Sequence, residues 1–362
     1  MDEVRERFQN LHEIVVAARH KLDRSIWDFL IGAAETETTT RRNRLALDSL
    51  AFRPRVMRNV GSTDCSSSFL GTKTRIPVMP APIGSIERFD PAGAALVADA
   101  AGAFGCPMFL SSVAAPELEE VAKSGTGVKF FQLYVRGDQG WVENFLDRAV
   151  AAGFDGLCLT VDTHHYSRRE RDIAKRYHAA SPRTMEHAKY QKAVDWAQFD
   201  LLRKKYKLPL MLKGIATAED AMLAVEHGVD VIYVSNHGGR QLDHGLGSID
   251  VLPEVVAAVK GRAQIIVDGG FCRGTDIVKA IALGANAVGI GRLYGYGLAA
   301  AGRDGVTRVL ELLEDEMIRC LGLLGVNRLD ELNPSYLRAA PAVTTPHVLS
   351  AFPYIDPADN RY

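Results

Sequence analysis

The chain has 362 residues, 47% hydrophobic and 24% charged, so it is long enough to bury a large core and has the composition of an ordinary soluble protein. Lys and Arg number 43 against 44 Asp and Glu, and this balance gives no single-sign field that would favour nucleic acid or an anionic membrane. Five cysteines without paired spacing, a charged start unlike a signal peptide and no apolar run of membrane-spanning length predict a cytoplasmic protein.

Short apolar runs alternate with segments of helical pattern from residue 76 onward, after a helical N-terminal extension predicted for residues 1–75. Strands are expected at 76–83, 107–110, 128–133, 156–161, 209–212, 231–234, 264–267 and 287–290. Helices are expected at 93–102, 116–124, 141–152, 195–206, 218–227, 248–259, 275–283 and 305–322.

Eight such units, with strands too apolar to face water, predict an α/β fold: a (β/α)8 TIM barrel at 76–322 within a single domain, residues 1–362. A doubly wound open sheet is the alternative, but no GxGxxG follows the first strand. The long charged connection at about 163–194 is typical of an active-site lid. Residues 323–362 form a C-terminal tail, and its proline-rich part from residue 334 is expected to wrap the surface.

A cluster of polar residues directly follows the apolar run 231–234, in the order Ser-Asn-His-Gly-Gly-Arg-Gln-Leu-Asp. Core packing would not select this combination. His237 could take a proton, and Arg240 could hold an anion. Because barrel active sites lie at the C-terminal ends of the strands, this segment is expected in the active site.

The ends of strands seven and eight carry glycines and arginines, which is the pattern of a barrel phosphate site. Lys213 ends strand five, where its charge could neutralise a reduced flavin ring. Alternatively, Lys213 could form a Schiff base in a phosphate-binding lyase or isomerase. The residues of the phosphate pattern are Asp268, Gly269, Gly270, Arg273, Gly291 and Arg292.

The segment Ser-Asn-His-Gly-Gly-Arg-Gln at 235–241 resembles the signature of the FMN-dependent α-hydroxy acid oxidase and dehydrogenase family, which includes glycolate oxidase, lactate oxidase and mandelate dehydrogenase. Supporting matches lie at 131–134, 159–163, 167–170, 212–214, 268–270 and 290–292. The resemblance implies FMN as cofactor, a small-molecule substrate and a homo-oligomer, a tetramer in this family. The residues it implies around FMN are Pro82, Ile83, Gly84, Ser111, Gln132, Thr160, Lys213, Ser235, Asp268, Gly269, Gly270, Arg273, Gly291 and Arg292.

The resemblance also implies oxidation of an (S)-2-hydroxy acid to a 2-oxo acid. His237 would be the base, taking a proton from either the hydroxyl or the α-carbon, and Asp162 would pair with it. Tyr134 would hydrogen-bond the substrate oxygen. Arg240 and Arg169 would clamp the carboxylate, for which a guanidinium fork is suited.

Departures from the family pattern predict a different substrate pocket. Phe29 stands where the family has a tyrosine that binds the carboxylate, so either simple hydroxy acids bind more weakly or the substrate lacks a carboxylate there. Gly84 and Val113 are small and predict a roomier pocket for a bulky or aromatic substrate. Cys272 replaces an arginine, so phosphate binding is expected to depend more on Arg292. No metal site is expected, because the adjacent pair at 164–165 is better interpreted as pocket-rim histidines.

Overall fold

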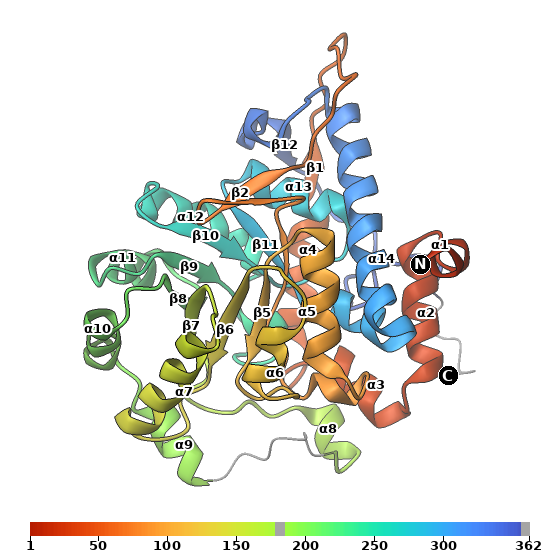
Figure 1. The fold of residues 1–362 in the computed structure, drawn as a ribbon. Helices are drawn as coiled ribbons and strands as arrows, with labels where there is room; N and C mark the ends of the chain where they lie inside the picture. The colour runs from red at the N-terminus through yellow and green to blue at the C-terminus, as the bar shows by residue number, and fades with distance from the viewer. Residues whose placement is uncertain (178–184, 356–362) are drawn as a thin grey trace.

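The computed structural model describes residues 1–177 and 185–355, and a sheet of eight parallel strands lies at its centre (Figure 1). All paired neighbours are parallel, and the first and last strands of the sheet also approach each other, so the sheet curls into a nearly closed barrel. The predicted (β/α)8 TIM barrel is therefore confirmed. The strand order is β4 (Val78–Pro80), β11 (Ala287–Ile290), β10 (Gln264–Val267), β9 (Val231–Val234), β8 (Leu210–Ile215), β7 (Gly156–Thr160), β6 (Lys129–Leu133) and β5 (Met108–Ser111).

Helices cover the outside of the barrel, as expected for a parallel sheet. No helix of residues 1–177 and 185–355 is long and apolar enough to cross a membrane. The covering helices are α5 (Gly93–Phe104), α6 (Leu118–Lys123), α7 (Gln139–Ala151), α10 (Trp196–Lys205), α11 (Ala218–Glu226), α12 (Ser248–Val259), α13 (Gly274–Ala282) and α14 (Arg292–Leu324).

The helix α14 corrects one prediction, because it starts directly after β11 and not at residue 305. Its first turns are rich in glycine, a composition that is typical of a loop. In the structure, α14 kinks at Ala301 and Gly302, and its two arms pack closely. A Cβ atom on Gly297 would lie 2.6 Å from the carbonyl oxygen of Gly305, so glycine at this position permits the close approach.

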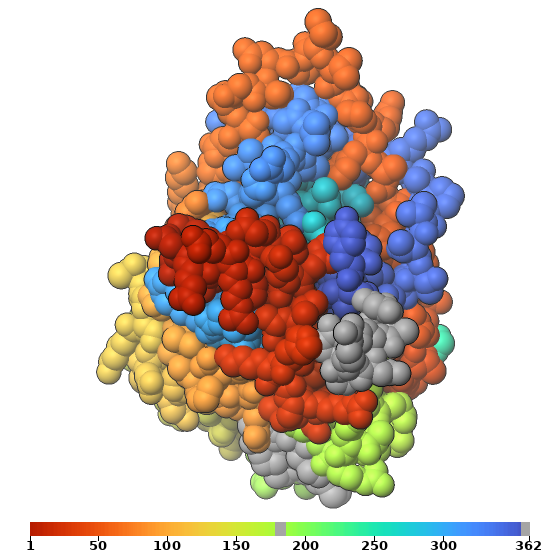
Figure 2. Space-filling view, turned by 90° about the vertical axis from the view of Figure 1, so that its right-hand side faces the viewer, coloured from red at the N-terminus to blue at the C-terminus, as the bar shows by residue number. Residues whose placement is uncertain are grey.

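The N-terminal extension contains strands as well as the predicted helices. The strand β1 (Leu50–Phe52) pairs antiparallel with β12 (Leu337–Ala339), so part of the predicted surface tail is an ordered strand. Figure 2 shows the N-terminal helices beside the C-terminal segment, although they lie far apart in sequence. The extension comprises α1 (Asp2–Arg7), α2 (Leu11–Lys21), α3 (Arg24–Ile31), α4 (Thr38–Asp48), β1 and the hairpin of β2 (Ser67–Phe69) and β3 (Thr72–Thr74).

The predicted lid carries two helices within the described residues, α8 (Glu170–Ala174) and α9 (Met185–Lys192). Residues 178–184 of this connection lie outside the described part. Short 3-10 turns complete the chain: η1 (Ile86–Arg88), η2 (His237–Gly239), η3 (Leu329–Glu331) and η4 (Pro334–Tyr336).

The interior of the barrel is filled by side chains from all eight strands, two of them from β9. Side chains alternate across a strand, so every second residue faces inward. Phe69 of the β2–β3 hairpin packs against this cluster and closes one end of the barrel. The clustered residues from the strands are Met79, Phe109, Phe130, Cys158, Met211, Val231, Tyr233, Ile266 and Ala287.

Candidate active site

A layer of polar residues lies at the C-terminal ends of the strands. Each of them follows the apolar interior residue of its own strand by two residues. Because the inward-facing side alternates, Gln132 follows Phe130, and Lys213 follows Met211. Six of the predicted cofactor residues meet in this way. They are Ser111, Gln132, Thr160, Lys213, Ser235 and Asp268, all buried.

Hydrogen bonds and one ion pair connect this layer. The amide of Gln132 donates to Thr160 Oγ1 at 2.8 Å. Lys213 Nζ lies 2.7 Å from Ser235 Oγ and 2.9 Å from an oxygen of Asp268. The structure thus places Asp268 against Lys213. Burial acts to lower the pKa of Lys213, but Asp268 and Asp162 outweigh it, so the pKa is raised and the amine keeps its charge.

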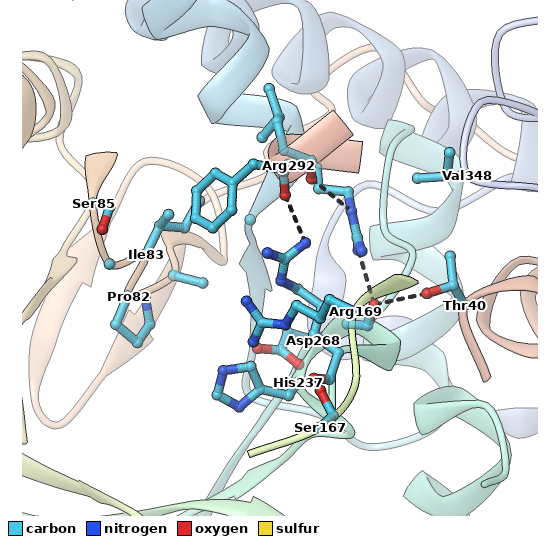
Figure 3. A pocket seen from close by; sticks show the side chains of 18 of the residues that line it. Thr40, Pro82, Ile83, Ser85, Ser167, Arg169, His237, Asp268, Arg292 and Val348 are labelled. Carbon is cyan, nitrogen blue, oxygen red and sulfur yellow. Dashed lines mark hydrogen bonds between the residues drawn. The ribbon is translucent and has the colours of Figure 1, made fainter. Parts of the chain in front are cut away.

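A cavity of about 680 Å³ opens above this layer. This size is typical of a cofactor or ligand site. Figure 3 shows Pro82, Ile83 and Ser85 on one side of it, and His237, Arg169 and Arg292 on another. The strand ends, the N-terminal extension, the lid and the tail all contribute to its lining.

A left-handed turn positions His237 at the edge of the cavity. Residues 237–239 have φ values of 59°, 63° and 76°, a region that glycine enters without strain. Gly239 also packs against α4, where a Cβ atom would lie 2.2 Å from Thr40 Oγ1. The two glycines after the histidine are therefore required by the backbone, which explains the sequence His-Gly-Gly.

His237 is hydrogen-bonded on both ring nitrogens. Its Nδ1 lies 3.0 Å from Asp162 Oδ1, and its Nε2 lies 3.2 Å from the Tyr134 hydroxyl. The Asp162 carboxylate can only accept, so Nδ1 carries the proton and Nε2 keeps its lone pair. Gly214 makes the pairing possible, because a Cβ atom there would lie 2.6 Å from Asp162 Cβ.

The electrostatics of this pair suit a base. Burial lowers the pKa of His237, although Asp162 opposes the shift, so the imidazole is neutral and can accept a proton at neutral pH. Burial acts to raise the pKa of Asp162, but the charge and hydrogen bond of His237 outweigh it and leave that pKa lowered. Asp162 therefore stays ionised beside an imidazole that becomes charged when it takes a proton.

Two arginines lie near His237 and line the same cavity, Arg240 and Arg169. Arg240 donates from Nη1 to the carbonyl oxygens of Phe29 and Gly32, and its guanidinium carbon lies 5.1 Å from the Phe29 ring centre. Arg169 is only 7% exposed, although its neighbours in sequence form a charged run. Burial lowers the pKa of Arg240, and the charges of Arg169 and Arg292 lower it further. An anion bound here would relieve this repulsion.

The structure places the three residues considered for the phosphate end, Arg292, Cys272 and Arg273, in different surroundings. Arg292 lines the cavity and donates to the carbonyl oxygens of Leu30, Gly32 and Gly238. Cys272 is buried beside the cavity, where burial raises its pKa to about 12, so it contributes no charge.

Arg273 lies away from the cavity. It pairs with Glu316 of α14 and donates to the Ala351 carbonyl oxygen. Its expected place at the phosphate is not supported by the structure, because α14 and the tail hold its guanidinium.

We expect Arg292→Met to be purified largely without FMN, because it removes a guanidinium that lines this end of the cavity next to Gly291. Arg273→Met is the matched control, since it loses the same charge outside the cavity. FMN per chain, measured from flavin absorbance after denaturation, distinguishes the variants. Equal FMN content in both variants would contradict this assignment.

Gly84 and Val113 form a complementary pair on the opposite wall. A Cβ atom on Gly84 would lie 2.5 Å from a methyl carbon of Val113, so the valine fills the space that the glycine leaves. The expectation that both small residues widen the pocket therefore needs a correction. Gly84 makes room for Val113, and Val113 itself lines the cavity.

Several cavity residues that the sequence did not indicate come from segments far from the barrel strands. Thr40 and Asn43 come from α4, Asp172 and Tyr177 from the lid, and His347 from the tail. Asn43 is 1% exposed and exchanges hydrogen bonds with Asn236. The polar run 38–44 was the available signal, but it also fits a solvated helix, so sequence alone could not separate the two.

The residues of this cavity fit a flavin mononucleotide. Gln132 Oε1 is buried and has no hydrogen-bond partner in the described part of the chain, so it can accept from a ring N–H. Lys213 supplies a buried positive charge beside it. At the other end, the space where Gly291 would carry a side chain is open, and Arg292 lies next to it. The cavity therefore has suitable groups for the flavin ring at one end and for the FMN phosphate at the other.

Comparison with known proteins agrees with this geometry. The profile of a family described as FMN-dependent dehydrogenase matches residues 18–339. Glycolate oxidase from Spinacia oleracea is 40% identical over 352 residues, covering 91% of this chain and 95% of that protein. L-lactate oxidase from Nostoc sp. is 38% identical over 355 residues, covering 91% and 97%.

A solved structure has the same architecture. It is a soluble mutant of the membrane-associated (S)-mandelate dehydrogenase from Pseudomonas putida, with a TM-score of 0.86 at 32% identity. The match covers 91% of this chain and 99% of the other. The chain belongs to the FMN-dependent dehydrogenase family, and FMN is its cofactor.

Proposed function

We propose that this protein oxidises the hydroxyl carbon of an (S)-2-hydroxy acid with a bulky or aromatic side chain, giving the 2-oxo acid, with His237 as the base. The observation that carries the proposal is the chain of hydrogen bonds Asp162–His237–Tyr134, which lies at the cavity beside Arg240 and Arg169. This set can bind a carboxylate and remove a proton from the carbon or oxygen next to it.

Binding and proton transfer follow from these positions. Arg240 and Arg169 would hold the substrate carboxylate, and Tyr134 would hydrogen-bond the α-oxygen. His237 Nε2 would take a proton from the hydroxyl or from the α-carbon, and the ionised Asp162 would stabilise the resulting imidazolium. FMN, when bound, supplies the acceptor for the electron pair that leaves the substrate.

The environment of Lys213 argues against a Schiff-base lyase or isomerase. A lysine must lose its proton to attack a carbonyl carbon. The ion pair with Asp268 keeps the pKa of Lys213 raised despite the opposing effect of burial, so the amine stays protonated. The charged amine of Lys213 is instead suited to neutralising negative charge on a flavin ring.

A largely apolar wall supports the preference for a bulky side chain. The wall contains three aromatic and three aliphatic side chains from the N-terminal extension, the connections after β4 and β5, and the lid. It includes Phe29, Ile83, Phe89, Val113, Ile173 and Tyr177. Burying an aromatic ring against such a wall contributes about 2–3 kcal/mol, whereas glycolate has no side chain to bury.

A panel of hydroxy acids tests this proposal. We expect mandelate to show a kcat/KM about 30-fold or more above that of glycolate, from the ring burial alone. The rate of anaerobic flavin reduction at varied substrate concentration is the measurement, with lactate and larger aromatic acids in the same series. If glycolate were the best substrate of a broad panel, the preference for bulky substrates would be wrong.

A further inference from the structure

The lid holds the aromatic residue Tyr177 at a defined position on the cavity wall. The helix α8 ends at Ala174, and Arg176, just beyond the C-cap residue Lys175, has a φ of 53°. The backbone N–H of Tyr177 donates to the Asp172 carbonyl oxygen, and that of Arg176 donates to the Ile173 carbonyl oxygen. This is the Schellman arrangement, in which the residue after the left-handed position turns back toward the helix. The backbone therefore fixes where the Tyr177 side chain starts.

Ion pairs hold α8 against the N-terminal extension. Arg171 donates to both carboxylate oxygens of Glu37, at 2.6 and 2.8 Å. Lys175 pairs with Asp28 of α3. Because α3 also carries Phe29, these contacts bring the end of the lid helix and Phe29 together.

The rings of Tyr177 and Phe29 are in contact, with centres 5.2 Å apart. The Arg240 guanidinium lies on the same Phe29 ring, 5.1 Å from its centre. All three residues line the cavity. Tyr177 therefore lies on the wall at which a carboxylate bound to Arg240 would be held.

The hydroxyl of Tyr177 is buried and has no hydrogen-bond partner within residues 1–177 and 185–355. Buried hydroxyls are normally paired, so an orphaned one beside a ligand cavity points to a partner that the ligand brings. Burial raises the pKa of Tyr177, and the hydroxyl keeps its proton at neutral pH. It is therefore available as a donor, and a carboxylate oxygen is the acceptor that Arg240 and Arg169 would bring to this wall.

We infer that Tyr177 is a substrate-binding residue whose hydroxyl donates to the substrate carboxylate, so that the lid supplies the phenol that Phe29 lacks. The inference rests on the proposed function, because it uses the same carboxylate site. If Tyr177 has this role, the substrate carboxylate is bound partly by the lid, which packs over the cavity, and not by the N-terminal helix α3.

Binding of a carboxylate that cannot be oxidised tests the inference directly. Phenylacetate has no α-hydroxyl, and phenylacetamide replaces its carboxylate with a neutral amide. In the holoenzyme, measured by the change in flavin absorbance, Tyr177→Phe should weaken phenylacetate binding about 10-fold or more, because hydrogen bonds to charged groups are the stronger ones. The loss for phenylacetamide should be several-fold smaller.

Two further variants separate binding from packing. Phe29→Tyr in the Tyr177→Phe background returns a hydroxyl to the neighbouring ring and should restore most of the phenylacetate affinity. Tyr296→Phe is the matched control, since its hydroxyl is also buried without a partner in the described residues but does not line the cavity. It should leave the Kd of phenylacetate unchanged.

Several outcomes would overturn the inference: an unchanged Kd in Tyr177→Phe, an equal loss for acid and amide, or no phenylacetate binding to the wild-type holoenzyme. The proposed function is judged separately, by whether hydroxy acids reduce the flavin. Flavin reduction together with an unchanged Kd in Tyr177→Phe would retain the function and reject this role for Tyr177.

Discussion

Replacing His237 with glutamine should slow flavin reduction by the substrate by about 10²–10⁴-fold, the usual contribution of a positioned general base. Glutamine keeps hydrogen-bonding groups of similar reach, but its amide cannot take a proton at neutral pH. The His237 side chain contacts Asp162 and Tyr134, whereas Arg292 binds backbone carbonyl oxygens that the substitution leaves in place, so FMN should stay bound. Stopped-flow measurement of anaerobic flavin reduction gives the rate.

The same loop provides the control for this variant. His244 lies seven residues further along, is largely exposed and does not line the cavity. His244→Gln should therefore reduce its flavin at the wild-type rate. A near wild-type rate in His237→Gln with full FMN content would mean that another group takes the proton.

Replacing Arg240 with methionine should lower kcat/KM for a hydroxy acid by at least about 30-fold, because truncating one partner of a buried charge pair costs about 2–5 kcal/mol. The loss should appear mainly as a raised KM, since Arg240 binds the carboxylate and does not move a proton. Steady-state kinetics with mandelate would measure both parameters.

Arg240→Lys separates charge from geometry. Lysine keeps the positive charge but cannot reproduce the planar fork that reaches Phe29 O, Gly32 O and a carboxylate together. We expect an intermediate KM. Since both variants lose contacts to α3, their FMN content and urea midpoint are measured alongside. An unchanged KM in a stable, flavin-loaded Arg240→Met would contradict the proposal that Arg240 binds the substrate carboxylate.

The barrel and its polar layer were predictable because both follow from local patterns. Apolar runs bounded by turn residues marked the strands, and the period of two then determined that Gln132 and Lys213 face the same interior as Phe130 and Met211. The His-Gly-Gly turn was equally local, since its left-handed backbone depends on the two glycines after His237.

Other features depended on contacts between distant segments and were not predictable. Arg273 follows the Asp-Gly-Gly turn, yet Glu316, 43 residues later, holds its side chain away from the cavity. Gly84 suggested open space, but Val113 occupies it. Tyr177 carried no signal of its own, because its position depends on how the lid helix pairs with α3. In each case the deciding partner lies on another element.

The most direct test of the account is an anaerobic single turnover of the wild-type holoenzyme with (S)-mandelate. We predict complete loss of the oxidised flavin absorbance and formation of one 2-oxo acid per FMN, with His237→Gln slowed by the factor given above. Persistence of the oxidised flavin with every 2-hydroxy acid of the panel, together with reduction by an alcohol that has no carboxylate, would contradict the central claim.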